Sequence, residues 1–186
     1  MGYLNSNPSV VGYFLEHAII RSIATSGLPC FDIVGPMAQL IFHEFPRYDL
    51  SLDKALYVPR KFNFPAIDAI FLRLDHTTKK AELFPIQITV QKGSHRNSED
   101  HFFKDLPNWK PYLERYNIKI TFLWITSGNQ FRRTEKKAKA RGRRDGSETK
   151  VWPNYESVIV PLHEVNCDVW RYQETRKAEE EFLALN

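Results

Sequence analysis

Polar side chains in two neighbouring segments could form a hydrolytic site. Asp68 comes at the start of a run of β-forming residues, directly after Phe64-Pro65-Ala66-Ile67. Gln87 and Thr89 lie within a later apolar run, Leu83–Val90. Phosphodiester hydrolysis needs a hard divalent cation held by oxygen ligands, because the cation stabilises the developing negative charge and lowers the pKa of the attacking water. An aspartate carboxylate and an amide oxygen on adjacent strands could hold such a cation.

The two segments are predicted to form a β-hairpin. Residues 66–74 and 81–91 both read as strands, and the polar turn 75–80 joins them. Side chains alternate between the two faces of a strand, so Gln87 and Thr89 share one face while the aliphatic residues between them occupy the other. A polar face on an otherwise apolar strand is a candidate site.

Periodic apolar patterns predict the elements that must position this hairpin. They comprise a helix from Ser9 to about Gly27, short strands within 37–45 and 55–64, a helix from Ser98 to Tyr116 interrupted at Pro107 or Pro111, a buried strand from Ile118 to Thr126, a strand from Ser157 to Leu162 and a helix from Arg171 to Leu185. This order predicts an α/β fold with a central mixed β-sheet flanked by helices.

Length and composition bound the organisation of the chain. With 186 residues, of which 42% are hydrophobic and 13% aromatic, the sequence suits one compact domain over residues 1–186. No apolar run approaches the roughly 20 residues of a membrane-spanning helix, and no secretory signal pattern stands at the N-terminus. Cys30 and Cys167 have no metal-type spacing and are expected to be two reduced thiols, with one disulfide as the alternative.

The positive charge of the chain is concentrated in a basic loop predicted at about 130–150. Between Arg132 and Lys150 there are nine basic residues against three acidic ones, so the remainder of the chain, out of a total of +4, carries −2. Such a segment could be a solvated surface loop, a phosphate-contacting arm or a nuclear-import signal. The candidate nucleic-acid-binding residues are Arg132, Arg133, Lys136, Lys137, Lys139, Arg141, Arg143 and Arg144.

The sequence resembles the PD-(D/E)xK nuclease superfamily, whose fold is that of the restriction endonucleases. The resemblance rests on an N-terminal helix containing Glu16, a Pro-x-x-Asp hairpin segment ending at Asp68 and the aliphatic strand that follows. Within that superfamily, the run Phe84–Thr89 followed by His95 is similar to the Gln-x-Thr…His pattern of nuclease-type domains in crinkler effectors and retrotransposon hot-spot proteins. Tyr13–His17 also resembles the first helix of those domains.

The resemblance implies a role for each matching residue. Asp68 would be the metal carboxylate, Gln87 would stand where most members have a second acid, and Glu16 would bind the metal directly or through water. Thr89 would occupy the usual lysine position. The two departures matter, because a neutral amide attracts Mg²⁺ less than a carboxylate does and a hydroxyl cannot supply the positive charge of a lysine.

Lys92 or His95 could supply the missing positive charge or proton transfer. Lys92 has the opposite strand parity to Gln87 and Thr89, so it reaches the site only if the strand ends or bulges near Gln91. His95 follows Gly93-Ser94 and is freer to turn inward, where it could move a proton or contact phosphate. Both remain candidates for a catalytic role.

These observations predict a nuclease that uses Mg²⁺ or Mn²⁺ and cleaves DNA, rather than RNA, with low sequence specificity. The resemblance implies an effector that acts in a nucleus, where host proteins would be further partners. One alternative is a degenerate nuclease fold that binds nucleic acid without cleaving it. The other is a module that binds a host protein and has only a vestigial site.

Overall fold

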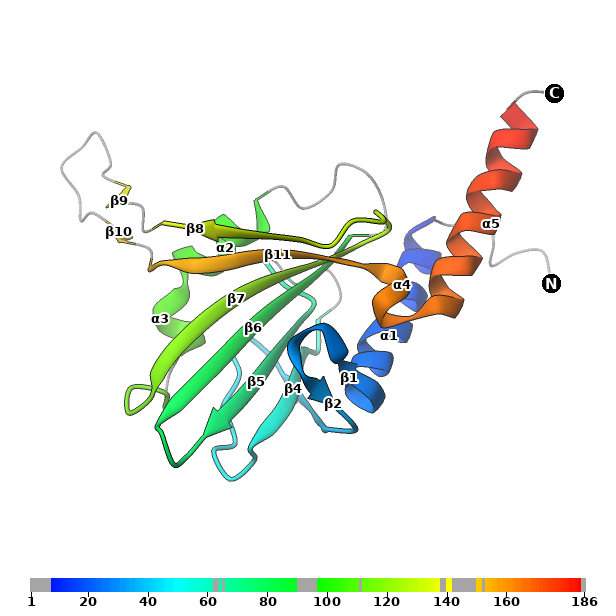
Figure 1. Ribbon diagram of the computed structural model, residues 1–186. Coiled ribbons are helices and arrows are strands. Elements are labelled where there is room, and N and C mark those ends of the chain that lie inside the picture. Colours follow the sequence, from blue (N-terminus) through cyan, green and yellow to red (C-terminus); the bar gives the residue numbers. More distant parts are fainter. Residues whose placement is uncertain are drawn as a thin grey trace.

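A seven-stranded mixed β-sheet forms the centre of the molecule, with helices against both faces (Figure 1). The computed structural model describes residues 8–61, 64, 66–89, 97–110, 112–137, 140–141, 150–151 and 153–184. In spatial order the strands are β3 (Ala38–Phe42), β4 (Lys54–Pro59), β5 (Ala69–Asp75), β6 (Lys80–Thr89), β7 (Asn117–Thr126), β11 (Tyr155–Pro161) and β8 (Arg132–Lys136). The predicted α/β class with a mixed sheet flanked by helices is confirmed.

The direction of the strands changes across the sheet. β4, β5 and β6 are antiparallel neighbours, so the predicted hairpin is present. β6, β7 and β11 run parallel, which buries β7 between two strands. β3 joins β4 in parallel and β8 joins β11 antiparallel, so β3 and β8 form the two edges. The apolar predicted strand at 118–126 is therefore central, as its composition indicates.

Helix α1 (Pro8–Ser26) packs on one face of the sheet through Ile19 and Ile23, which are fully buried. The helix begins at Pro8, one residue before the predicted start at Ser9. Gly27 ends the helix at a φ of +86°, and a Cβ there would lie 2.1 Å from the carbonyl oxygen of Ile33. Only glycine fits this turn into the small β1–β2 pair.

The remaining short elements surround the large sheet. They are β1 (Gly27–Leu28) and β2 (Ile33–Val34), the 3-10 helix η2 (Pro29–Phe31), the strand pair β9 (Ala140–Arg141) and β10 (Lys150–Val151), and the helices α4 (Leu162–Val165) and α5 (Cys167–Ala184). Both cysteines are free, one half-buried and the other exposed. Within the described residues, no helix is long and apolar enough to cross a membrane.

The opposite face of the sheet is covered by two short helices, α2 (Ser98–Lys104) and α3 (Leu106–Trp109). The helix predicted over 98–116 is interrupted, as expected, but the break falls at Asp105 rather than at Pro107 or Pro111, and the chain returns through turns after Trp109. Phe102 and Trp109 stack at 5.3 Å between ring centroids in a core of aromatic side chains. This α2-side core closes the face on which the polar residues of β6 lie.

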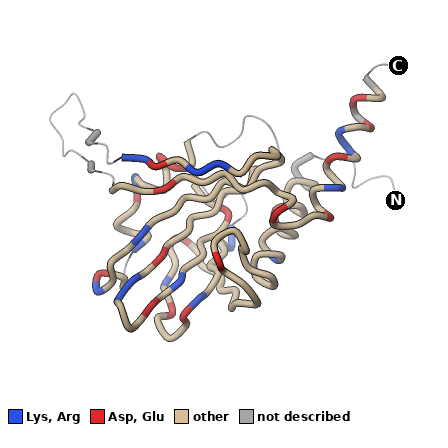
Figure 2. The backbone as a smooth tube through the Cα atoms, viewed as in Figure 1, with Lys and Arg blue, Asp and Glu red and all other residues tan. Residues whose placement is uncertain are grey.

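The basic segment is not a loop throughout. Its first part is the edge strand β8, and two further short stretches pair as β9 and β10. Lys139, Arg143 and Arg144 lie outside the described residues. Figure 2 shows the basic residues of β8 along the edge of the large sheet that this strand forms.

Candidate functional site

The carboxylate of Asp68 and the amide of Gln87 meet on the α2-side face of the sheet. Asp68 immediately precedes β5, and its backbone N–H donates to the carbonyl of Ile86 at 2.8 Å, which fixes the start of the hairpin ladder. Gln87 Nε2 donates to Asp68 Oδ2 at 2.6 Å, and the backbone N–H of Ile88 donates to the same oxygen at 2.6 Å. The structure therefore brings together two residues that the sequence places 19 positions apart.

Ser98 sets the orientation of the Gln87 amide. The Ser98 hydroxyl, in the first turn of α2, donates to Gln87 Oε1 at 3.0 Å, while Nε2 of the same amide points to Asp68. Gln87 is only 1% exposed, so few other partners can compete. The amide thus presents a donor, and its oxygen could face a cation beside Asp68 only if the amide turned over. Ser98 was not predicted as a site residue from the sequence. The one feature that could have indicated it is its position in the first turn of a predicted helix that follows β6.

Glu16 of α1 acts on Asp68 electrostatically, as the smallest of the three causes that set the pKa of this carboxyl. Burial raises the pKa of Asp68 to about 7, with the N–H of Ile88 acting against that rise and the carboxylate of Glu16 adding to it. Glu16, on α1, is half-buried, and burial also raises its pKa. A second carboxylate close enough to raise the pKa of Asp68 is the arrangement that a bound cation would stabilise.

Thr89 lies on the same strand face as Gln87, two residues further along β6. Its hydroxyl oxygen is buried and has no hydrogen-bond partner within the described part of the chain. A buried hydroxyl without a partner is unfavourable by roughly 1–3 kcal/mol, and the residues that directly follow Thr89 lie outside the described part of the chain. Lys92 and His95, the remaining candidates for the site, lie outside the described residues.

A second polar cluster on the same face is centred on Glu99 of α2. The indole of Trp124 donates to Glu99 Oε1 at 2.7 Å, and the hydroxyls of Ser157 and Tyr155 donate to its carboxylate at 2.6 and 2.7 Å. These donors come from the adjacent strands β7 and β11. Three hydrogen bonds to a carboxylate fix α2 against the sheet and hold Ser98, the preceding residue, toward Gln87. No local pattern in the sequence indicated this cluster.

The sheet register connects the site with the basic edge. Gln87 lies opposite Trp124, Trp124 opposite Ile159, and Ile159 opposite Arg132, so these residues form one row on the α2-side face. Three strand spacings of about 4.8 Å put Arg132 roughly 14 Å from Gln87. Lys136 has the same strand parity as Arg132. Basic side chains and acidic site therefore lie along one face.

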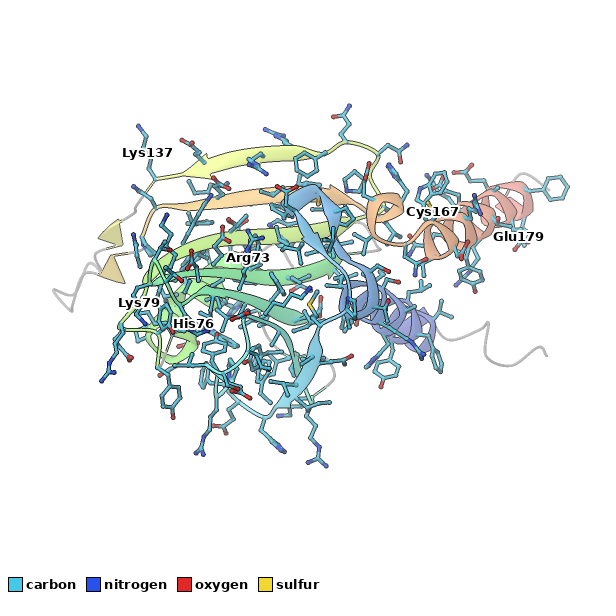
Figure 3. The ribbon with its side chains drawn as sticks, turned by 60° about the horizontal axis from the view of Figure 1, so that its bottom comes forward. Arg73, His76, Lys79, Lys137, Cys167 and Glu179 are labelled. Atoms are coloured by element: carbon cyan, nitrogen blue, oxygen red, sulfur yellow. The ribbon has the colours of Figure 1, made fainter. Side chains whose placement is uncertain are left out.

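Arg133 and Lys137 do not extend that row. Arg133 has the opposite strand parity to Arg132, and its guanidinium lies 5.6 Å from the ring centroid of Phe31 on the α1-side face. Lys137, just beyond β8, is exposed (Figure 3). The predicted nucleic-acid-binding residues of β8 are thus divided between two faces of the sheet.

The donor atoms near Asp68 suit a hard cation. Carboxylate and hydroxyl oxygens are groups that Mg²⁺ and Mn²⁺ bind, and Asp68 Oδ1 accepts no hydrogen bond from the described residues, whereas the amide oxygen of Gln87 is directed to Ser98. Within those residues there is no group of three or more histidine, cysteine, aspartate and glutamate side chains that could hold a metal. A site here would depend on Asp68 and Glu16 for its charge.

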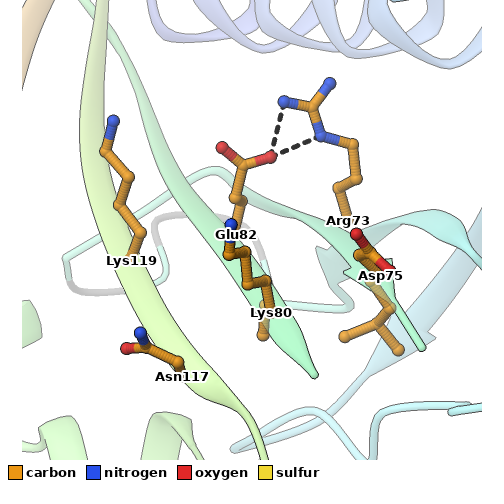
Figure 4. Close-up of a pocket in the computed structure, with 8 residues that line it drawn as sticks. Arg73, Asp75, Lys80, Glu82, Asn117 and Lys119 are labelled. Carbon is orange, nitrogen blue, oxygen red and sulfur yellow. Dashed lines mark hydrogen bonds and ion pairs between the residues drawn. The ribbon is translucent and has the colours of Figure 1, made fainter. Parts of the chain in front are cut away.

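A cleft of about 540 Å³ lies at the other end of the sheet, among residues of β5, β6 and β7 (Figure 4). Its basic and acidic side chains are paired: Arg73 with Glu82 across the β5–β6 hairpin, and Lys119 with Glu156 at 3.2 Å. Opposite charges on adjacent strands are typical of a solvated sheet face. Because Arg73 and Lys119 already have acidic partners, the Asp68 site is the stronger candidate.

The structure brings Asp68 and Gln87 into contact at one end of the hairpin, with Thr89 on the same strand face as Gln87 and Glu16 within electrostatic reach of Asp68. No family model, curated protein or solved structure matches the chain. A functional assignment therefore has to rest on this geometry and on the chemistry of its residues.

Proposed function

We propose that the protein is a nucleic-acid hydrolase of the PD-(D/E)xK type that depends on Mg²⁺ or Mn²⁺. One observation carries the proposal: the carboxylate of Asp68 meets a buried amide from the adjacent strand and has a second acid, Glu16, within electrostatic reach. The chain order of α1, the β5–β6 hairpin, α2 and the parallel strand β7 supports a restriction-endonuclease-like core.

Each residue has a distinct role in this proposal. Asp68 and Glu16 hold the cation, which when bound would activate water and stabilise the charge of the reacting phosphate. Gln87 orients the Asp68 carboxylate through its Nε2, and Ser98 fixes Gln87. Thr89 adds a hydroxyl at the same face. Lys92 or His95 would contact the phosphate or move a proton.

The substrate class follows from the charge on the same face. Arg132 and Lys136 can contact phosphates without reading bases, which favours cleavage with low sequence specificity, and DNA is the substrate that we propose. The concentration of basic residues after position 131 is also typical of a nuclear-import signal, so we propose action in a nucleus, with host nuclear proteins as further partners.

A cleavage assay tests the proposal. Plasmid, single-stranded DNA and RNA are incubated with the protein in Mg²⁺ or Mn²⁺ and in chelator. We expect metal-dependent cleavage by the wild type and none by Asp68→Ala, with Asp53→Ala as the matched control. Asp53 is an aspartate near the opposite end of the sheet whose side chain is 84% exposed. The proposal fails if the wild type does not cleave, or if both variants cleave equally.

Binding without cleavage is the second candidate, because the Gln87 amide already satisfies Asp68 with a donor. Under this alternative, wild-type protein would bind nucleic acid in the presence of Mg²⁺ and leave it intact. Gln87→Glu then provides a discriminating measurement by isothermal titration. The new carboxylate restores the missing ligand charge, so Gln87→Glu should bind Mg²⁺ more tightly than wild type. If the wild type is an active nuclease, it should already bind Mg²⁺ measurably without this substitution.

Salt dependence of binding should locate the nucleic-acid surface. Replacing Arg132 and Lys136 together by alanine should reduce the slope of log K against log salt by about 2, because two phosphate contacts are lost. Arg133→Ala is the control on the same strand, since its side chain lies over Phe31 on the other face. Fluorescence anisotropy with short DNA duplexes measures both slopes. Equal slopes for the two variants would contradict an interface on the α2-side face.

A further inference from the structure

Among the described residues, the contacts that anchor helix α5 to the domain lie at its beginning. Asn166 caps it, because its Oδ1 accepts the backbone N–H of Val169 at 2.9 Å, and Asn166 Nδ2 donates to the hydroxyl of Ser22 on α1 at 2.7 Å. Val169 is buried and Trp170 packs against the α1-side core. The first turn of α5 therefore belongs to the body of the molecule.

The rest of α5 extends away from the sheet (Figure 1). Figure 3 shows Cys167 at its base and Glu179 far along it. Tyr172 and Leu183 are 41% and 74% exposed. The projecting part, residues 171–184, is of a length that is marginal in water without tertiary packing, and large apolar side chains on it indicate a surface that another molecule covers.

A self-complementary stripe runs along this projecting part. Tyr172, Arg176, Glu179 and Leu183 are separated by four, three and four residues, so they lie within about 60° of one another around the helix axis. Along the stripe the order is apolar, positive, negative, apolar. Turned end for end, the same order places each apolar residue opposite an apolar one and each charge opposite its counter-charge.

We propose that α5 pairs with α5 of a second copy of this chain, antiparallel, about a twofold axis between residues 177 and 178. In that pair Tyr172 packs against Leu183 of the other copy at both ends, and Arg176 faces Glu179 twice in the middle. A twofold interface uses the same patch on both copies, so self-complementarity is the property it requires. The inference does not rest on the proposed hydrolase function.

The apolar contacts and the ion pairs of the proposed dimer have different roles. The two Tyr–Leu contacts bury apolar surface and supply most of the attraction, whereas exposed ion pairs contribute little to affinity. The charges instead select the orientation, because a parallel pair would place Arg176 opposite Arg176 and Glu179 opposite Glu179. The interface is short, so the dimer should dissociate on dilution.

Charge reversal tests the pairing in the full chain. Arg176→Glu and Glu179→Arg each place like charges opposite each other twice, so each variant alone should be monomeric at concentrations where wild type is dimeric. An equimolar mixture of the two restores both opposite-charge contacts and should form a heterodimer at least as tight as the wild-type dimer. Sedimentation equilibrium over a dilution series measures all three, and circular dichroism confirms that the helix content is unchanged.

Matched controls distinguish the effect of a charge change within the stripe from the effect of a change in net charge. Lys177→Glu and Glu181→Arg make the same charge changes on the other side of α5, so each should leave dimerisation within about twofold of wild type and their mixture should show no gain. A monomeric wild type at every concentration overturns the proposal. So does a dimer that Arg176→Glu does not weaken, or one that Lys177→Glu weakens equally.

Discussion

An Asp68→Asn variant is expected to unfold at a higher temperature than wild type at pH 8 in the absence of divalent cations. Burial raises the pKa of Asp68 from an ordinary 3.8 to about 7, so above pH 7 the folded protein holds an ionised carboxylate that it disfavours. The cost is at most about 4 kcal/mol, since each pKa unit corresponds to about 1.4 kcal/mol. Asparagine can accept the same hydrogen bonds without the charge.

The pH dependence of this gain has a definite sign. A raised carboxyl pKa leaves stability unaffected below pH 4, where Asp68 is neutral in both states, and lowers it progressively as the pH rises from about 4 to about 7. The advantage of Asp68→Asn should therefore be greatest above pH 7 and shrink as the pH falls. Calorimetry at several pH values measures it, and a difference independent of pH would contradict the raised pKa.

Added Mg²⁺ or Mn²⁺ should reverse that ranking if the site binds a cation. Binding to the folded state stabilises wild type in proportion to the logarithm of metal concentration, whereas Asp68→Asn loses a charged ligand and should respond little. The reversal separates metal binding from catalysis, because it requires no substrate.

A Trp109→Ala variant is expected to lose about 3–5 kcal/mol of unfolding free energy. Trp109 is 2% exposed, and its ring lies 4.8 Å from that of Phe45 and 5.3 Å from that of Phe102. Tyr48 also donates to its carbonyl at 2.6 Å. Because this core holds α2 against the sheet, the loss should also loosen the contact of Ser98 with Gln87.

Urea unfolding monitored by circular dichroism measures the effect of Trp109→Ala. The control is Phe131→Ala, an aromatic truncation at a side chain that is 45% exposed, which should cost less than about 1 kcal/mol. A similar loss in both variants would contradict the importance of the α2-side core.

The sequence predicted those parts of the fold whose patterns are long and local. Helix α1, the β5–β6 hairpin and the apolar strand β7 each have a periodicity or composition that determines their type. The meeting of Asp68 and Gln87 was also predictable, because strand alternation decides which side chains share a face. The exact position of the break between α2 and α3 was not, since the turn at Asp105 depends on how Phe102 and Trp109 pack together.

The finer geometry of the site depends on contacts distant in sequence. Gln87 was predicted as a source of an amide oxygen, yet its orientation is set by Ser98, eleven residues away on another element. The Glu99 cluster draws donors from three other positions, the farthest 58 residues away. Side-chain hydrogen bonds of this range leave no periodic trace in the chain.

The two edges of the sheet differ in what they offer to another strand. β8 carries Arg132, Arg133 and Lys136, and such charges on an unpaired strand oppose backbone pairing with a neighbouring copy. β3 instead exposes Ile41, which is 64% accessible. Growth of a sheet by successive addition of copies requires both edges, so the cationic edge protects the protein from fibrous aggregation even when the other edge is accessible.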